Sequence, residues 1–182
     1  MAELVVVRPD RVVAPAPHTS LAPRARPKPG DVLVIVDNGK PNAGELLAAF
    51  ARRLIDLLGL DPADVQVERK PAAGQPITED RARALGERAT IAITGLGDCG
   101  GCSACSVHDA VLLERFGVPA VPVITEPFQG LAGMVADRLG LPGLSPVVVP
   151  HPVSTKDQPW LEELAERHAD RMASLLAERV PA

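Results

Sequence analysis

The sequence lacks the features that would mark a membrane, secreted or nucleic-acid-binding protein. The N-terminal stretch MAELVVVRPDRVV has an apolar run too short to cross a membrane, and it lacks a charged n-region leading into a signal sequence. The 19 lysines and arginines are scattered among 23 acidic residues, so no basic surface for nucleic acid is apparent. We therefore expect a cytoplasmic protein whose partners include neither membrane nor nucleic acid.

Cysteine is scarce and confined to one place. Cys99, Cys102 and Cys105 all lie in CGGCSAC, and three thiols so close together cannot form a framework of long-range disulfides. A chain of 182 residues also buries about two-thirds of its surface on folding and needs no such cross-links. In a reducing compartment, clustered thiols indicate catalysis, redox cycling or metal ligation.

A dinucleotide-binding fingerprint is also missing. The segment GLGDCG, residues 95–100, has its glycines at the wrong spacing and a cysteine at the turn. The sequence therefore predicts neither NAD nor flavin. We expect no cofactor unless the cysteines bind a metal or an iron–sulfur cluster.

Residues 1–30 are dense in proline and predict an extended N-terminal arm. Two short valine runs within it could add an edge strand or hold a partner subunit, which favours a homo- or hetero-oligomer; a tail without fixed structure is the alternative. The basic residues Arg24, Arg26 and Lys28, separated by prolines, are expected to keep the segment solvated.

Residues 31–182 predict a single α/β domain. Valine- and isoleucine-rich runs typical of strands buried on both faces alternate five times with helical patterns, beginning with DVLVIVD and GELLAAFARRLIDLLG. Right-handed connections give a doubly wound parallel five-stranded sheet, flavodoxin-like or Rossmann-like, with helices on both faces. We favour the strand order 2-1-3-4-5, in which ligands bind at the carboxyl ends of the strands.

Polar residues collect at those predicted strand ends, which indicates a single active face. The candidate substrate-binding residues are Asp37, Asn38, Lys40, Asn42, Gly97 and Thr125, and the candidate catalytic residues are Asp98, Cys99, Cys102, Glu126 and His151.

The functional role of several of these residues can be interpreted in more than one way. Lys40 could be the counter-charge of a substrate carboxylate or phosphate, whereas Asn42 could simply cap the following helix. Asp98 would raise the pKa of a neighbouring thiol if charged, or could orient a substrate amine or carry a proton. Glu126 could act as general acid or base or cap a helix, and His151 could deliver a proton at neutral pH.

The cysteine loop, residues 95–108, contains the strongest candidate. Cys99 lies just before a helix expected to begin at Ser103, or at Gly101–Cys102, and the positive end of a helix lowers the pKa of a thiol. Cys99 is therefore the candidate nucleophile, and Cys102 is placed as a resolving thiol.

Metal ligation is the alternative for the same loop. The spacing of Cys99, Cys102 and Cys105 resembles part of an iron–sulfur loop, with His108 continuing the step of three. On a regular helix each step of three rotates by about 60°, so the four side chains would not all point at one metal.

Two segments, DNGKPNA and GDCGGCSACSVHDAVLLERFGVPAVPVITEPF, resemble the UGSC family of selenoprotein-like proteins, named for a selenocysteine-Gly-Ser-Cys tetrapeptide. Cys99 stands at the selenocysteine position, Gly101 replaces the serine and Cys102 is the final cysteine. More distantly, the loop, helix and next strand look like component B of the glycine, sarcosine and betaine reductases. The resemblance implies nucleophilic or redox chemistry at Cys99.

The function predicted from these observations is that of a thiol-dependent reductase or lyase, or a subunit of one, acting on a small polar substrate. An external thiol or a protein electron donor would restore the thiols. A metal or iron–sulfur protein is the second hypothesis, and a non-catalytic partner subunit that grips another chain with its arm is the third.

Overall fold

The computed structural model describes residues 16–177, so the two valine runs of the arm lie outside the described residues. The sheet is parallel and has the order β2-β1-β3-β4-β5. The strands are β1 (Leu33–Asp37), β2 (Val65–Arg69), β3 (Ile91–Gly97), β4 (Ala120–Thr125) and β5 (Val147–Val149). The predicted fold class and strand order are confirmed.

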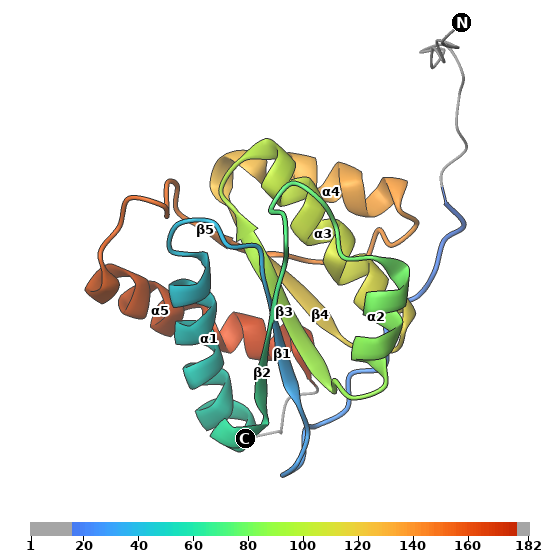
Figure 1. Ribbon diagram of the computed structural model, residues 1–182, viewed down its shortest axis with the longest axis horizontal. Helices are drawn as coiled ribbons and strands as arrows, with labels where there is room; N and C mark the ends of the chain where they lie inside the picture. The colour runs from blue at the N-terminus through green and yellow to red at the C-terminus, as the bar shows by residue number, and fades with distance from the viewer. Residues whose placement is uncertain (1–15, 178–182) are drawn as a thin grey trace, which may run out of the picture.

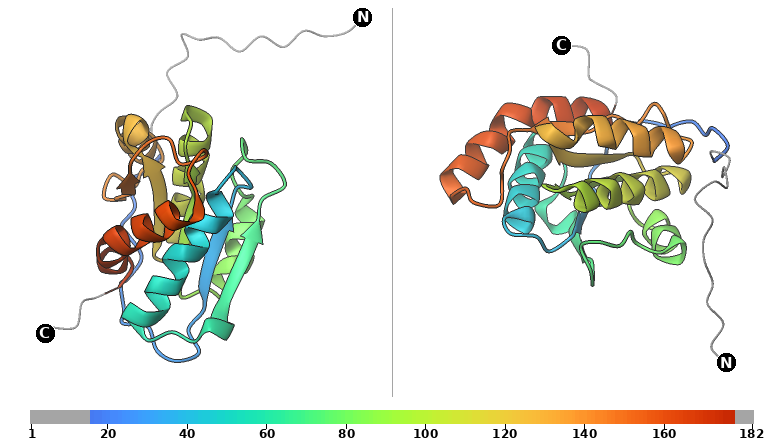
Figure 2. Two further views of the ribbon diagram at one scale, coloured as in Figure 1. Left: turned by 90° about the vertical axis from the view of Figure 1, so that its left-hand side faces the viewer. Right: turned by 90° about the horizontal axis from the view of Figure 1, so that it is seen from above.

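Helices cover both faces of the sheet, as Figure 1 shows. They are α1 (Ala43–Leu58), α2 (Glu79–Gly86), α3 (Gly100–Arg115), α4 (Gln129–Arg138) and α5 (Gln158–Leu176), with the short 3-10 helices η1 (Pro62–Asp64) and η2 (Glu126–Phe128). The neighbouring pair α1 and α5 packs on one face (Figure 2), and α2, α3 and α4 pack on the other.

This division follows from the alternation of side chains along the strands. In β1, Leu33 and Ile35 join the core under α1 and α5, whereas Val34 and Val36 join the core under α2, α3 and α4. All residues of β1, β3 and β4 are buried, which explains their continuous apolar runs.

The chain leaves β1 and β3 toward opposite faces, because α1 and α3 cover different sides of the sheet. The carboxyl ends of these two adjacent strands therefore form the switch point at which open α/β sheets bind ligands. The cysteine loop and the segment after β1 both start there.

The described part of the arm packs against its own chain. Thr19 donates a backbone hydrogen bond to Gly140, and the amide of Ala22 donates to the Glu114 carboxylate. Arg24 forms two hydrogen bonds with the same carboxylate, whose side chain is fully buried. The expectation that Arg24 keeps the segment solvated is wrong, because its guanidinium neutralises a buried charge.

Between residues 16 and 177, no helix combines the length and apolar character needed to span a bilayer.

Candidate active site

Cys99 is the N-cap of α3 rather than a residue of the preceding loop. The helix begins at Gly100, one residue before the earlier of the two starts expected from the sequence, Gly101–Cys102 and Ser103. Cys99 has an extended backbone, with φ −156° and ψ 166°, so its side chain folds back over the first turn. Its sulfur accepts a hydrogen bond from the Cys102 amide at 3.3 Å, replacing the usual hydroxyl or carboxylate cap.

The N-cap conformation also brings two thiols together. The Sγ atoms of Cys99 and Cys102 are 2.7 Å apart and form a hydrogen bond. Both cysteines are free; Cys99 is exposed and Cys102 is buried. An exposed thiol that contacts a buried one is the arrangement expected of a nucleophile and a resolving thiol.

The two thiols have different acidities. Burial opposes ionisation of Cys99, but hydrogen bonds from Cys102 and Gly101 and the charge of Lys40 together hold its pKa below the ordinary value. Burial, followed by the hydrogen bond and charge of Cys99, raises the pKa of Cys102 to about 11. Cys99 is therefore the first of the two thiols to lose its proton, and Cys102 keeps its own.

A cavity of about 240 Å³ opens onto this pair. It is lined by Lys40, Pro41, Asp98, Cys99, Cys102 and Ser154, which come from the loops after β1, β3 and β5. Three segments far apart in the sequence therefore share one site.

Of the predicted residues after β1, only Lys40 lines the cavity. The Asp37 carboxylate accepts the amide of Gly39 at 2.8 Å, and the Asn38 side chain donates to the Leu96 carbonyl at 2.9 Å. Asp37 and Asn38 are both buried, and these contacts fix the turn from which Lys40 extends.

Asn42 is not a side-chain cap of α1. It has a left-handed backbone (φ 63°), and its amide nitrogen donates to the carbonyls of Val153 and Lys156 at 2.9 and 2.7 Å. Asn42 therefore ties the start of α1 to the segment after β5, residues 150–157, here called the β5 loop.

Asp98 holds the same loop from the other side. Its carboxylate accepts hydrogen bonds from the amides of Val153 and Ser154 and from Nδ1 of His151, the last at 2.9 Å. The pKa of the neighbouring Cys99 is lowered overall, because hydrogen bonds from Cys102 and Gly101 and the charge of Lys40 outweigh burial. The Asp98 carboxylate is engaged with the β5 loop.

The contacts of His151 define its tautomer. Because the Asp98 carboxylate only accepts, Nδ1 carries the proton of this hydrogen bond. The Nδ1 atom also lies 3.1 Å from the Thr125 hydroxyl oxygen. That hydroxyl donates to the Gly97 carbonyl. Both contacts use Nδ1, and none of the hydrogen bonds within residues 16–177 involves Nε2 of His151.

Replacing Asp98 with asparagine is expected to loosen the β5 loop, because a neutral amide cannot accept from three donors. Amide hydrogen exchange at Val153 and Ser154 should accelerate by about 10- to 100-fold, the loss of one charge-assisted hydrogen bond. Unchanged exchange at both amides in the folded variant would show that Asp98 does not hold the loop. Asp64→Asn, a change in η1, is the control.

Glu126 and Gly97, like the other predicted residues apart from Lys40, Asp98, Cys99 and Cys102, do not line the cavity. Glu126 is exposed at the start of η2, and Gly97 is buried under α3, where a Cβ would lie 2.8 Å from Ser103 Oγ. Their catalytic and substrate-binding roles stay predictions. Gly97 is required by close packing in any case.

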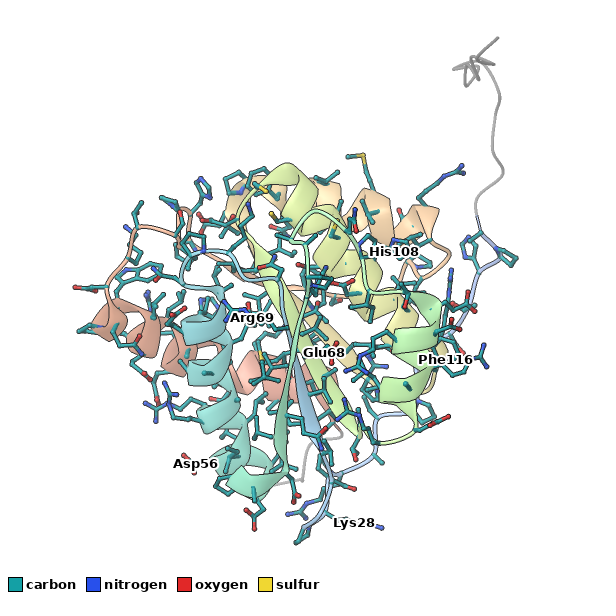
Figure 3. The ribbon with its side chains drawn as sticks, viewed as in Figure 1. Lys28, Asp56, Glu68, Arg69, His108 and Phe116 are labelled. Atoms are coloured by element: carbon teal, nitrogen blue, oxygen red, sulfur yellow. The ribbon has the colours of Figure 1, made fainter. Side chains whose placement is uncertain are left out.

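The four metal-ligand candidates do not meet. Cys105 and His108 line a separate apolar pocket between α3 and α4, and burial raises the pKa of Cys105 and lowers that of His108. Figure 3 labels His108, which belongs to α3. Within residues 16–177, no group of three or more histidine, cysteine or carboxylate side chains is placed to hold a metal ion. The donor set therefore does not fit the metal or iron–sulfur alternative.

Sequence reasoning missed Ser154 and the role of the β5 loop. Ser154 lies in HPVSTKDQP, which carries no motif, and its place in the cavity depends on contacts to Asp98 across 56 positions. The proline-flanked His151 was the only signal in that segment.

The sheet order and the paired thiols at its carboxyl edge define a flavodoxin-like, doubly wound α/β protein with a candidate thiol site. The family model of the UGSC family matches residues 5–178, and the chain belongs to the UGSC family. The more distant resemblance to component B of the glycine reductases stays a prediction. No curated protein matches the sequence.

Solved structures with a similar fold include two cyanobacterial proteins. A diflavin flavoprotein A3 from Nostoc sp. is 17% identical with a TM-score of 0.44, over 81% of this chain and 96% of that one. A flavodoxin-like domain from Synechococcus sp. is 13% identical with a TM-score of 0.41, over 79% of this chain and 99% of that one. The fold assignment itself follows from the strand order.

Proposed function

We propose that this protein is a thiol-dependent enzyme, or the catalytic subunit of one, that cleaves or reduces a bond in a small polar substrate. Cys99 is the nucleophile and Cys102 the resolving thiol. The observation that carries the proposal is the contact of 2.7 Å between an exposed thiol of lowered pKa and a buried thiol of raised pKa.

The two thiols supply the two electrons of a reductive cleavage. The Cys99 thiolate attacks an electrophilic atom of the substrate and displaces the leaving group, which takes the electron pair of the broken bond and a proton. The Cys102 sulfur then attacks Cys99 Sγ, and the substrate fragment departs with the electrons of its bond to sulfur and a second proton. A Cys99–Cys102 disulfide remains, and two thiols of an external reductant restore it.

The raised pKa of Cys102 orders these steps. While Cys99 is a thiolate, its charge and hydrogen bond keep the proton on Cys102. Once Cys99 is bonded to substrate, that charge is gone and the pKa of Cys102 falls, so the resolving thiol ionises only when it is needed. Asp98 and His151 are proposed to position and supply a proton at the edge of the site.

The rate of Cys99 alkylation by iodoacetamide as a function of pH tests this proposal. We expect half-maximal reactivity below the pH of an ordinary cysteine thiol, with peptide mapping to assign the modified residue. In Cys102→Ala the Cys99 sulfur loses the side-chain donor at position 102, so the midpoint should move upward. Cys105→Ser, which changes a thiol in the other pocket, should leave the midpoint near that of the parent.

Oxidation provides the second readout. One equivalent of a thiol oxidant should give a Cys99–Cys102 disulfide, detected as a loss of two mass units in the peptide that contains both residues. A midpoint at or above the ordinary thiol value, or a Cys99 that stays unreactive in the folded protein, would contradict the proposal.

A further inference from the structure

The cavity at Cys99 contains a cation without a carboxylate partner among the described residues. Lys40 lines it, and none of the ion pairs within residues 16–177 includes Lys40. The nearest acidic residue in sequence, Asp37, is instead bonded to Gly39 and lies 3.8 Å from Arg69.

The one carboxylate in the cavity lining is already satisfied. Asp98 accepts from His151, Val153 and Ser154, so its charge is directed into the β5 loop. These bonds, with those of Asn42, also fix the backbone of Ser154 at the cavity wall. The cavity therefore combines one available positive charge with a hydroxyl on a fixed segment.

Lys40 is not the only group that stabilises the Cys99 thiolate. Hydrogen bonds from the Cys102 thiol and from two amides of α3 also stabilise the Cys99 thiolate. The ammonium can therefore attract a substrate anion while the thiolate stays stabilised by these donors. As Cys99 bonds to a substrate atom, the thiolate charge disappears and the attraction of Lys40 for that anion strengthens.

We propose that the Cys99 cavity selects small anionic substrates, carboxylates in particular. Lys40 binds the anionic group and Ser154 donates a hydrogen bond to it, while Cys99 attacks an electrophilic atom close by. A volume of about 240 Å³ limits the substrate to a small molecule. This inference specifies the substrate class of the proposed function and rests on it.

Two alkylating reagents that differ in charge test the inference with the full chain. Iodoacetate and iodoacetamide both lose iodide to a thiolate, but only iodoacetate is an anion. The ratio of the two second-order rate constants at Cys99 cancels the thiolate fraction of Cys99. Dividing it by the same ratio for glutathione cancels the intrinsic difference in reactivity between the two reagents. The normalised ratio then reports recognition of the carboxylate. We expect a normalised ratio of about five, the upper range for an exposed charge pair, that falls as salt is added.

Variants assign this preference to Lys40. Lys40→Met should bring the normalised ratio to about one and Lys40→Arg should retain most of it, whereas Ser154→Ala should lower it in part. Lys28→Met, which removes an exposed lysine of the arm, is the matched control and should leave it unchanged. Lowered reactivity toward both reagents in Lys40→Met reports only the effect of Lys40 on the thiol pKa.

The outcomes separate the two proposals. Rapid reaction with both reagents at a ratio equal to that of glutathione, or a ratio that Lys40→Met does not change, would overturn the anionic-substrate inference and leave the thiol enzyme standing. A Cys99 unreactive toward both reagents would overturn the proposed function and this inference with it.

Discussion

Replacing Asp109 with asparagine is expected to lower the free energy of unfolding by about 3–5 kcal/mol, the cost of leaving a buried charge without its partner. Asp109 on α3 accepts from Lys70 Nζ at 2.5 Å and from the amide of Ile77 at 2.7 Å. Both charged side chains are 1% exposed. Urea unfolding followed by the fluorescence of Trp160, the single tryptophan, measures the change.

A second variant separates the buried charge from a general effect of changing α3. Lys70→Met combined with Asp109→Asn keeps an oxygen for the Ile77 amide and removes the unpaired ammonium, so it should recover at least half of the lost stability. Asp137→Asn, at an exposed position of α4, should change the unfolding free energy by less than about 0.5 kcal/mol. If Asp109→Asn alone is as stable as the parent protein, the ion pair between Lys70 and Asp109 does not stabilise the fold.

Gly97→Ala is expected to affect stability and the thiol site together. The added Cβ would lie 2.5 Å from Ile124 Cδ1, 2.8 Å from Ser103 Oγ and 3.0 Å from Ser103 Cα. Overpacking of this kind costs about 1–3 kcal/mol. Ser103 belongs to the first turn of α3 and bonds the Cys99 carbonyl through its amide and hydroxyl, so the helix start should shift away from Cys99 and the thiol pKa should rise.

The matched control is Gly101→Ala, which changes another glycine nearby, in the first turn of α3. No atom lies within 4 Å of a Cβ at Gly101, and alanine is the better helix former, so this variant should be at least as stable as the parent. Urea unfolding and the pH profile of Cys99 alkylation are measured on both variants. Equal stability of the two would show that Gly97 is not packed as tightly as its neighbours indicate.

The fold was predictable because its signals are local. The run LVIVD of β1 is buried at every position, and the stripe of leucines in α1 faces one core, so each element could be recognised from its own residues. The alternation of five strands and helices then left few possible topologies. The start of α3 was misplaced because a cysteine is not a common N-cap, and propensity gives Cys99 no such role.

The site was predictable only in part. Cys99 and Cys102 are three residues apart at a helix start, so sequence spacing sufficed to pair them. The contacts of Asn42 and Asp98 with the β5 loop join residues 53 to 114 positions apart, and no local pattern encodes them. The buried ion pair of Lys70 and Asp109 could not be predicted for the same reason. In the sequence both are ordinary charged residues, and only the fold buries them together.

The sequence by itself determined the doubly wound sheet, the face on which to look and the identity of the thiol pair, because hydrophobic period and helix-start geometry act over a few residues. Only the tertiary structure decided that Lys40 and Ser154 share the cavity of Cys99 while Cys105 and His108 line another. The physical reason is that loops from β1, β3 and β5 become neighbours only when the strands align in register, which is a property of the packed sheet.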